Sequence, residues 1–213
     1  MSRCGMPKRT TTSYALLGLL RIRPWTTYEL AKQAQKSLNW FWPRAERKLY
    51  DEPKFLVAEG LASATVEATG KRSRTVYAIT RSGREELGRW LDEPAQPRAG
   101  EFEAMVKVFF ADGGSLAQLR VTLDRIEAEA LARIADLAGQ AEAVQAFPDR
   151  THINAVSIRL YFEQEQAVLT WVRWAREQVA GWRSTADPGD WDATTALGEM
   201  AARARKVAGR SGP

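Results

Sequence analysis

Cysteine and histidine are nearly absent from this 213-residue chain, which contains one of each, Cys4 and His152. A single cysteine excludes an intrachain disulfide and fits a reducing compartment, for which we expect the cytoplasm. One cysteine and one histidine far apart in the sequence do not supply the ligands of a zinc site. The sequence therefore predicts neither a disulfide framework nor a metal centre.

Long apolar runs and catalytic motifs are also missing. No apolar run approaches the roughly 20 residues that a membrane-spanning helix needs, and residues 1–9 lack the apolar core of a secretory signal. No glycine-rich loop that could cradle a phosphate is present. His152 has no nucleophile beside it, and Glu163, Glu165 and Glu177 have the spacing of ordinary helix-surface carboxylates. We therefore expect no membrane association, no enzymatic activity and no cofactor.

Charge of both signs is abundant but unevenly distributed. The hydrophobic fraction of 45% is that of a globular protein, and the formal net charge is +5. Residues 1–91 carry 17 Lys and Arg against 8 Asp and Glu, whereas residues 92–213 carry 14 against 18. This asymmetry indicates that the first part of the chain binds a polyanion such as DNA, and a random scatter of surface charge is the alternative.

The first part of the chain has the pattern of three short helices. Thr26 and Glu29 form a capping box that starts the second helix, and Gly60 is suited to end the third. Pro53 falls in the middle of the third helix, where it should kink the helix or end it with a restart. The three predicted helices span about Ser13 to Leu20, Thr27 to Ser37 and Pro43 to Glu59.

A hairpin and a fourth helix follow. The two strands are predicted at Leu61–Val66 and Thr75–Ile79, and the turn between them at Gly70-Lys71-Arg72. The next helix is capped by Thr80 or Ser82 and reaches Leu91, and Ser82 and Glu85 match a second capping box. A short helix with exposed cations, followed by a two-stranded ribbon with a cationic tip, is the layout of a winged helix-turn-helix.

The second part of the chain is helical after a linker. Helices are predicted at about Glu101–Ala111, from a Ser115 cap to Phe147, at Thr151–Trp182 and at Ala193–Val207. The second of these carries an apolar seam and the third a similar apolar stripe. The seam is Leu116, Leu119, Leu123, Ile126, Ala130, Ile134, Leu137, Ala141 and Val144, and the stripe is Ile153, Val156, Leu160, Ala167, Trp171, Trp174 and Gln178.

These elements predict a mainly α protein with a small β-hairpin. We assign residues 11–91 to a winged helix-turn-helix domain and residues 101–207 to an antiparallel helical dimerisation and effector domain. Residues 92–100 contain two prolines and a glycine without periodicity, and we assign them to a linker. The seam is too long and too apolar to stay exposed on a monomer, so we expect a two-fold homodimer whose interface uses residues 101–182.

Candidate DNA contacts lie on the third helix, on the hairpin tip and at the start of the second helix. The N-terminal half of a recognition helix enters the major groove, where arginine is suited to guanine. Arg44, Arg47 and Lys48 occupy that half, and Tyr50 and Lys54 are better placed for backbone phosphates. The other candidates are Lys71, Arg72 and Arg74 at the hairpin tip, and Thr26 and Thr27 at a helix N-terminus, which suits a phosphate. For each single cation, a solvated surface residue is the alternative.

Several of these stretches resemble, in order and spacing, the PadR-like transcriptional regulators. The segments that carry the resemblance are Leu16–Leu20, Thr27–Ala31, Leu49-Tyr50, Leu56, Glu59–Leu61, Tyr77–Arg84 and Trp90-Leu91. The family usually has leucine where this chain has Pro53, and the helical remainder, including Val106–Asp112, is similar to the dimerisation region of the family's longer members. The resemblance implies a homodimer, usually a repressor, that binds a pseudo-palindromic operator on double-stranded DNA and is released by a small molecule. A winged helix that binds other proteins is the alternative function.

Four tryptophans, Trp90, Trp171, Trp174 and Trp182, lie on predicted helices that should meet in the second part of the chain. Packing in the core and in a dimer interface is one interpretation, since aromatic side chains contribute strongly to both. A cavity for a small aromatic effector is the other, because apolar pockets between helices bind flat ligands. The family resemblance favours the effector interpretation.

Overall fold

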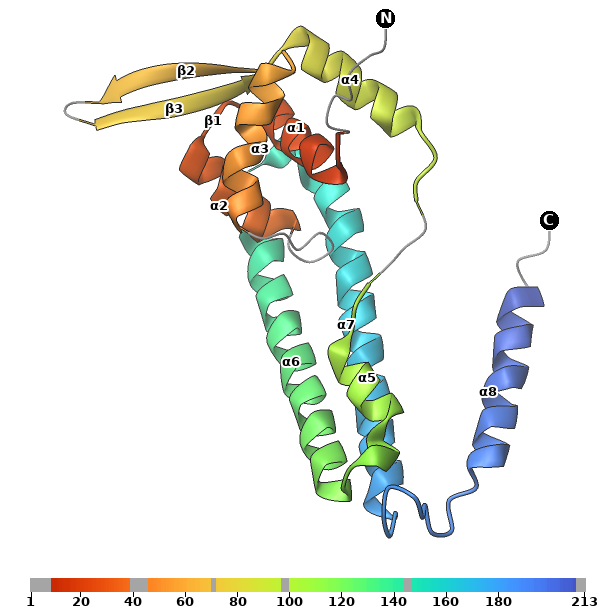
Figure 1. Cartoon of the computed structure of the whole chain (residues 1–213). Helices are drawn as coiled ribbons and strands as arrows, with labels where there is room; N and C mark the ends of the chain where they lie inside the picture. The colour runs from red at the N-terminus through yellow and green to blue at the C-terminus, as the bar shows by residue number, and fades with distance from the viewer. Residues whose placement is uncertain (1–8, 39–45, 70–71, 97–99, 144–146, 210–213) are drawn as a thin grey trace, which may run out of the picture. The chain divides into compact units, whose positions relative to one another are not determined.

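The computed structural model describes residues 9–38, 46–69, 72–96, 100–143 and 147–209, without the side chains of Glu46, Arg47, Ala68, Thr69 and Arg72. The chain separates into two compact units, Met1–Arg98 and Ala99–Pro213. The architecture is mainly helical with a small antiparallel sheet, as predicted (Figure 1). The sheet belongs to the first unit.

The first unit has the winged-helix order of elements. Its helices are α1 (Thr11–Ile22), α2 (Thr27–Leu38), α3 (Glu46–Ala58) and α4 (Arg81–Asp92), and its strands are β1 (Trp25–Thr26), β2 (Ala62–Thr69) and β3 (Arg72–Ile79). β2 and β3 form the predicted hairpin, here called the wing (Figure 1). A third strand, β1, was not predicted; it pairs Trp25 with Tyr77 and Thr26 with Val76 of β3. Two residues are too few to show the alternation by which a strand is detected in a sequence.

A leucine-rich core holds the helices of the first unit together. Leu16, Leu17 and Leu20 of α1 are fully buried, together with Leu30 of α2 and Leu56 of α3. Each such side chain contributes roughly 1.5–3 kcal/mol when it leaves water. The core therefore fixes α2 and α3 against α1 and leaves the other sides of α2 and α3 open.

α3 continues without interruption through Pro53, so of the two predicted alternatives, a kink or an end with a restart, the restart is wrong. Proline lacks the N–H that would donate to the carbonyl one turn earlier, which removes one hydrogen bond from the helix. Its ring is fully buried on the same side of α3 as the buried Leu49 and Leu56. Packing of this apolar side against the core therefore outweighs the missing hydrogen bond.

The wing is joined closely to the ends of α3 and α4. Gly60 ends α3 as predicted, with a φ of 72°, and the Leu61 N–H donates back to α3 at 2.9 Å. Thr80 caps α4 by accepting from the Gly83 N–H at 3.0 Å. The predicted capping box at Ser82 is wrong, because Ser82 lies inside α4. A Cβ at Gly83 would lie 2.0 Å from the Leu61 carbonyl oxygen, so glycine permits the contact between α4 and the chain before β2.

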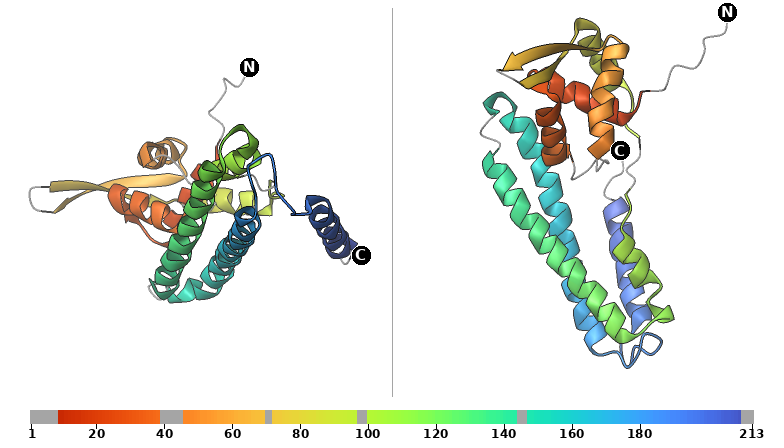
Figure 2. Two further views of the ribbon diagram at one scale, coloured as in Figure 1. Left: turned by 90° about the horizontal axis from the view of Figure 1, so that it is seen from below. Right: turned by 60° about the vertical axis from the view of Figure 1, so that its left-hand side comes forward.

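The second unit is built around an antiparallel pair of long helices. α6 (Leu116–Ala143) and α7 (Thr151–Ala180) run side by side in opposite directions (Figure 1 and Figure 2). α5 (Glu103–Phe109) and the 3-10 turn η1 (Ala111–Gly113) precede α6, the 3-10 turn η3 (Pro148–Arg150) precedes α7, and α8 (Ala193–Ala208) follows it. No helix in the described part of the chain is long and apolar enough to cross a membrane.

The seam predicted on α6 is buried over most of its length. Leu119, Leu123, Ile126, Ala130 and Leu137 are buried, and Leu116 and Ile134 are half-buried. Ala141 at the far end is exposed, and Val144 lies outside the described residues. The seam therefore supplies the α6 side of the core, and its partner is α7 of the same chain.

The stripe predicted on α7 is mostly exposed, and of its residues Trp171 packs against the cluster that α7 buries with α6. Val172, Ala175 and Val179 form the α7 side of the buried cluster instead. Ile153, Val156 and Leu160 of the predicted stripe are between 48% and 75% exposed. α7 is apolar on two sides, and apolar residues at helical spacing do not tell which side faces α6. The exposed side leaves an apolar surface on the single chain.

Candidate nucleic-acid interface

α2 and α3 lie against each other in the first unit, like the two helices of a helix-turn-helix (Figure 1). On α3, Lys48 and Lys54 are exposed and Tyr50 is half-buried. Arg44 lies outside the described residues, and Arg47 is described only by its backbone within α3. Lys48 and Lys54 therefore lie on the part of α3 that the core leaves open, as a contact with DNA requires.

Lys54 has an acidic neighbour on the same helix. Its ammonium nitrogen lies 3.5 Å from the Asp51 carboxylate, and the two side chains are 69% and 61% exposed. An exposed pair one helical turn apart contributes roughly 0.5 kcal/mol or less. A phosphate can therefore draw Lys54 away from Asp51 at small cost, which keeps Lys54 a candidate for a backbone contact.

The wing places Arg74 directly opposite Glu67. The Arg74 guanidinium donates to one carboxylate oxygen of Glu67 through Nε at 3.1 Å and through Nη2 at 2.9 Å. Lys71 lies outside the described residues, and Arg72 is described only by its backbone in β3. Of the three cations expected at the wing tip, Arg74 thus has its charge balanced by Glu67 in the free protein.

Glu29 occupies the start of α2, where a phosphate was expected. Its carboxylate accepts from the Thr26 hydroxyl at 2.7 Å and from the Thr26 N–H at 2.9 Å, and its own N–H donates to the Thr26 hydroxyl at 3.3 Å. This is the predicted capping box. Hydrogen bonds from the hydroxyl and the N–H of Thr26 hold the pKa of Glu29 below its usual value. A phosphate near Thr26 or Thr27 would therefore lie beside an ionised carboxylate, which opposes its binding there.

An exposed row on α2, formed by Tyr28, Lys32 and Lys36, was missed from the sequence. All three side chains are exposed, and the Lys32 ammonium lies 5.8 Å from the centroid of the Tyr28 ring. They follow one another at four-residue steps, which places them on one side of the helix. The first helix of a helix-turn-helix crosses the DNA backbone, so this row is suited to phosphates. The four-residue spacing after the capping box is the signal that could have found it.

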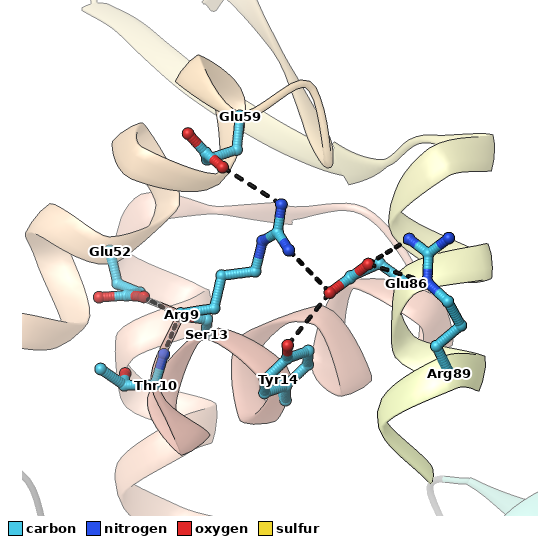
Figure 3. Close-up of polar contacts among 8 residues, drawn as sticks. All are labelled: Arg9, Thr10, Ser13, Tyr14, Glu52, Glu59, Glu86 and Arg89. Carbon is cyan, nitrogen blue, oxygen red and sulfur yellow. Dashed lines mark hydrogen bonds and ion pairs between the residues drawn. The ribbon is translucent and has the colours of Figure 1, made fainter. Parts of the chain in front are cut away.

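A polar cluster connects the end of α3 to α1 and α4 (Figure 3). The Arg9 guanidinium donates to Glu59, just after α3, at 3.3 Å and to Glu86 of α4 at 2.9 Å. Glu86 is buried and also accepts from the Tyr14 hydroxyl at 3.1 Å and from the Arg89 guanidinium. The cluster therefore holds the C-terminal end of α3 against two neighbouring helices.

Hydrogen bonds and burial shift pKa values in this cluster. The Arg89 guanidinium holds the pKa of Glu86 below its usual value despite burial, and the Tyr14 hydroxyl and the Arg9 charge act in the same direction. Burial raises the pKa of Tyr14, and its hydrogen bond to Glu86 adds to this. Glu86 is thus ionised and Tyr14 protonated at neutral pH, which is the state that their hydrogen bond requires.

A second contact ties the middle of α3 to α1 (Figure 3). The fully buried Ser13 hydroxyl donates to the Glu52 carboxylate and accepts from the Thr10 N–H at 3.0 Å. α3 is therefore attached to its neighbours both near its middle and at its end. These attachments limit the rotation of α3 about its axis and so fix the direction in which Lys48 and Lys54 project.

Two of the four tryptophans considered as effector contacts have packing roles in the structure. Trp90 stacks on Tyr14 in the first unit, with ring centroids 4.8 Å apart and an interplanar angle of 4°. Trp171 belongs to the second unit and packs against the buried cluster between α6 and α7. Both contacts match the interpretation of these residues as core.

The other two tryptophans gather around Trp191, which was not considered from the sequence. Trp182 stacks on Trp191 with centroids 5.6 Å apart, and Trp174 meets Trp191 edge to face at 6.4 Å. The indole N–H of Trp182 is buried without a hydrogen-bond partner among the described residues. Within the same described ranges, no group of three His, Cys, Asp or Glu side chains could hold a metal ion. Trp174, Trp182 and Trp191 thus form an aromatic cluster in which the indole N–H of Trp182 is a donor without a partner among the described residues.

Two family models match the chain over its two units. Residues 16–89 match the transcriptional regulator PadR-like family, and residues 103–180 match the virulence activator alpha C-terminal region. Together with the fold, these matches define a winged-helix transcriptional regulator. More particularly, the chain carries a PadR-like family domain at residues 16–89, followed by a virulence activator alpha C-terminal region at residues 103–180.

The relatives agree with this assignment. The negative transcriptional regulator PadR of Bacillus subtilis is 28% identical over 171 residues, which are 75% of this chain and 92% of that protein. A crystal structure of Bacillus subtilis PadR with operator DNA has a TM-score of 0.70 at 24% identity, covering 80% of this chain and 99% of that one. A crystal structure with p-coumaric acid has a TM-score of 0.63 at 25% identity, with the same coverage. These relatives are transcriptional regulators rather than enzymes.

Proposed function

We propose that this protein binds a pseudo-palindromic DNA operator as a homodimer in the cytoplasm and represses transcription there. The observation that carries the proposal is a PadR-like domain whose α2, α3 and wing expose cations. These cations are Lys32, Lys36, Lys48, Lys54 and Arg74. A negative regulator among the relatives supports repression.

The contacts divide into base readout and phosphate binding. We assign base edges to Arg44, Arg47 and Lys48, because the start of a recognition helix enters the major groove. We assign phosphate contacts to Tyr50 and Lys54 of α3 and to the row on α2. The wing cations Lys71, Arg72 and Arg74 are assigned to the adjacent phosphates or minor groove.

The exposed apolar side of α7 supports the homodimer. Ile153, Val156 and Leu160 form a continuous apolar strip that the single chain leaves uncovered. A two-fold dimer presents two recognition helices about 34 Å apart, which matches half-sites one helical turn apart. Dimerisation through the second unit therefore fits an operator with two-fold symmetry.

Fluorescence anisotropy with duplex DNA at two salt concentrations tests the proposal. We expect a duplex that the protein selects from a random library to bind at least about 10³-fold more tightly than a scrambled duplex, and affinity to fall steeply with salt. Arg47→Ala should weaken binding to the selected duplex by about 1–3 kcal/mol and to the scrambled duplex far less. Arg81→Ala, an exposed change on α4, is the control. Binding that is insensitive to salt and sequence would favour a protein-binding winged helix instead.

A small aromatic effector that releases the operator is the second part of the proposal. Bacillus subtilis PadR has been crystallised with p-coumaric acid, and this chain groups Trp174, Trp182 and Trp191 around one buried indole donor. Trp90 and Trp171 remain candidate effector contacts within the homodimer. A ligand releases DNA only if it binds one dimer shape more tightly than the other.

Titration with planar aromatic acids tests the effector. We expect tryptophan quenching together with a loss of operator affinity of roughly 5- to 150-fold, the usual range of such coupling. Trp174→Ala should abolish the release, and Trp90→Ala shows whether the tryptophan stacked on Tyr14 also takes part. If no compound both quenches the tryptophan fluorescence and releases the operator, the tryptophans serve packing alone.

A further inference from the structure

α8 extends the chain beyond the part that the family models match. The second match ends at residue 180, whereas α8 begins at Ala193. Its start is fixed on the second unit, because Trp191 stacks on Trp182. Asp192 then caps the helix by accepting from the Thr195 N–H at 2.9 Å. α8 is therefore an anchored arm rather than a loose tail.

The body of this arm is uncovered in the single chain. None of its residues is buried, and its ribbon stands away from α5, α6 and α7 in Figure 1 and in the left-hand view of Figure 2. Leu197, Met200 and Val207 are between 59% and 69% exposed. Their spacing of three and seven residues places them on one side of the helix, with Ala204 between them. α8 thus presents an apolar side without a partner.

α8 is basic, whereas the rest of the second unit is acidic. The helix carries Arg203, Arg205 and Lys206 against Glu199. Residues 99–192 carry 9 Lys and Arg against 15 Asp and Glu. Charge complementarity therefore favours the acidic helical surface as the partner of α8. DNA would also attract the cations, but it would leave the apolar side of α8 in water.

A matching surface lies on α5 and the residues that flank it. Phe102, Val106, Phe109 and Phe110, here called the aromatic face, are between 40% and 79% exposed. The rings of Phe109 and Phe110 meet edge to face with centroids 5.0 Å apart. The acids around this face are Glu101, Glu103 and Asp112, against Lys107, which pairs with Glu103 at 2.9 Å, and Arg125 of α6, whose charge also acts on Glu103. The aromatic face therefore offers exposed apolar area for the apolar side of α8 and negative charge for its cations.

We propose that α8 of one copy docks on the aromatic face of a second copy. Met200 and Leu197 cover the phenylalanine rings, since methionine sulfur and aromatic rings attract each other. The arginines reach the flanking carboxylates or stack on the rings. Both surfaces stay exposed within one anchored chain, so the second copy supplies the missing partner. The inference rests on the homodimer proposed above and adds an exchanged arm to it.

Carboxyl–amine cross-linking of full-length protein, mixed from unlabelled and nitrogen-15-labelled copies, tests the exchange. Native mass spectrometry first establishes that mixed dimers have formed. Lys206 is the only lysine of α8, and we expect it to be linked to Glu101, Glu103 or Asp112 in pairs that combine a light and a heavy peptide. Links found only in pairs of a single isotope, with no light–heavy pair, would place α8 on its own chain and overturn the inference. The absence of any link from Lys206 to these acids would overturn it as well.

A pair of substitutions tests the apolar side directly. Leu197→Gln with Met200→Gln keeps good helix formers on α8 while removing its apolar side. We expect the mixed links to disappear and the dimer dissociation constant to rise at least about tenfold. Ala202→Gln, on the opposite side of α8, should change neither. Unchanged links in the double variant would contradict the docking mode.

The same samples separate this inference from the proposed function. A wild-type dimer that binds its selected duplex but gives no mixed Lys206 links overturns the exchanged arm alone. A wild-type monomer in sedimentation, or binding without sequence preference, contradicts the proposed function itself.

Discussion

The pairing of Arg74 with Glu67 makes the wing less basic than its sequence suggests. A phosphate must displace Glu67 before it can accept from both guanidinium donors of Arg74. Glu67→Gln keeps the shape of the side chain and removes its charge. We expect all duplexes to bind roughly two- to fivefold more tightly, as an exposed pair of roughly 0.5–1 kcal/mol allows.

Anisotropy with selected and scrambled duplexes measures this gain, and a steeper salt dependence should accompany it. Glu85→Gln removes the same charge from exposed α4 and is the matched control. An equal gain of affinity in both variants would show that the change in net charge, and not the release of Arg74, causes the effect.

Glu86 makes the first unit sensitive to acid. Its pKa is lowered because Arg89 donates to it, with Tyr14 and Arg9 contributing. A carboxyl group with a lowered pKa in the folded state stabilises the fold above its unfolded pKa, about 4.3 for glutamate. That contribution is lost as pH falls through the folded pKa. Glu86→Gln should therefore lower the free energy of unfolding by about 1–3 kcal/mol at pH 7 and by much less at about pH 3.

Urea unfolding followed by circular dichroism at the two pH values checks this prediction. Glu85→Gln again provides an exposed comparison on the same helix. A loss of equal size at both pH values would show that Glu86 acts through packing and not through its charge.

On α2, the row of Tyr28, Lys32 and Lys36 should bind DNA backbone without reading sequence. Lys32→Gln with Lys36→Gln removes two phosphate contacts, which should reduce the slope of log affinity against log salt by about 1.8. Selected and scrambled duplexes should lose affinity alike, whereas Arg47→Ala should affect the selected duplex more. Arg81→Gln on α4 removes an exposed cation outside the row, and an unchanged slope in the α2 variant would exclude the row from the interface.

Elements with local signals were predicted well. The capping box of Thr26 and Glu29 and the stop at Gly60 depend on residues a few positions apart, and the structure has both. β1 could not be predicted, because its two residues are a strand only through their pairing with β3. The restart predicted as one alternative at Pro53 was wrong, because burial in the tertiary core outweighs the effect of a local helix breaker.

The same distinction applies to the candidate site. Lys48 and Lys54 were predicted as exposed cations because helical spacing separates them from the buried leucines. The partner of Arg74 follows only from the register of β2 and β3, which the sequence leaves open. For α7, two apolar sides compete at the same spacing, and only the position of α6 decides between them.

In the whole protein, the proposed DNA binding should depend on dimerisation. Ile153, Val156 and Leu160 leave an apolar strip on α7 uncovered. A dimer binds two half-sites at once, and the second contact benefits from a high effective concentration. Loss of the dimer should therefore reduce affinity for a duplex with two half-sites far more than for one with a single half-site.

Val156→Glu places a charge in the middle of this strip and should raise the dimer dissociation constant more than tenfold. A tenfold change of this constant corresponds to roughly 1.4 kcal/mol, and burying an unpaired charge costs several times as much. Ala155→Glu adds the same charge to α7 outside the strip and is the control. Sedimentation gives the association state, and anisotropy gives the two affinities.

If Val156→Glu leaves a dimer that Leu197→Gln with Met200→Gln dissociates, the copies are held by the exchanged arm and the strip on α7 serves another partner. If Val156→Glu alone gives monomers, the strip forms the two-fold interface and the arm reinforces it.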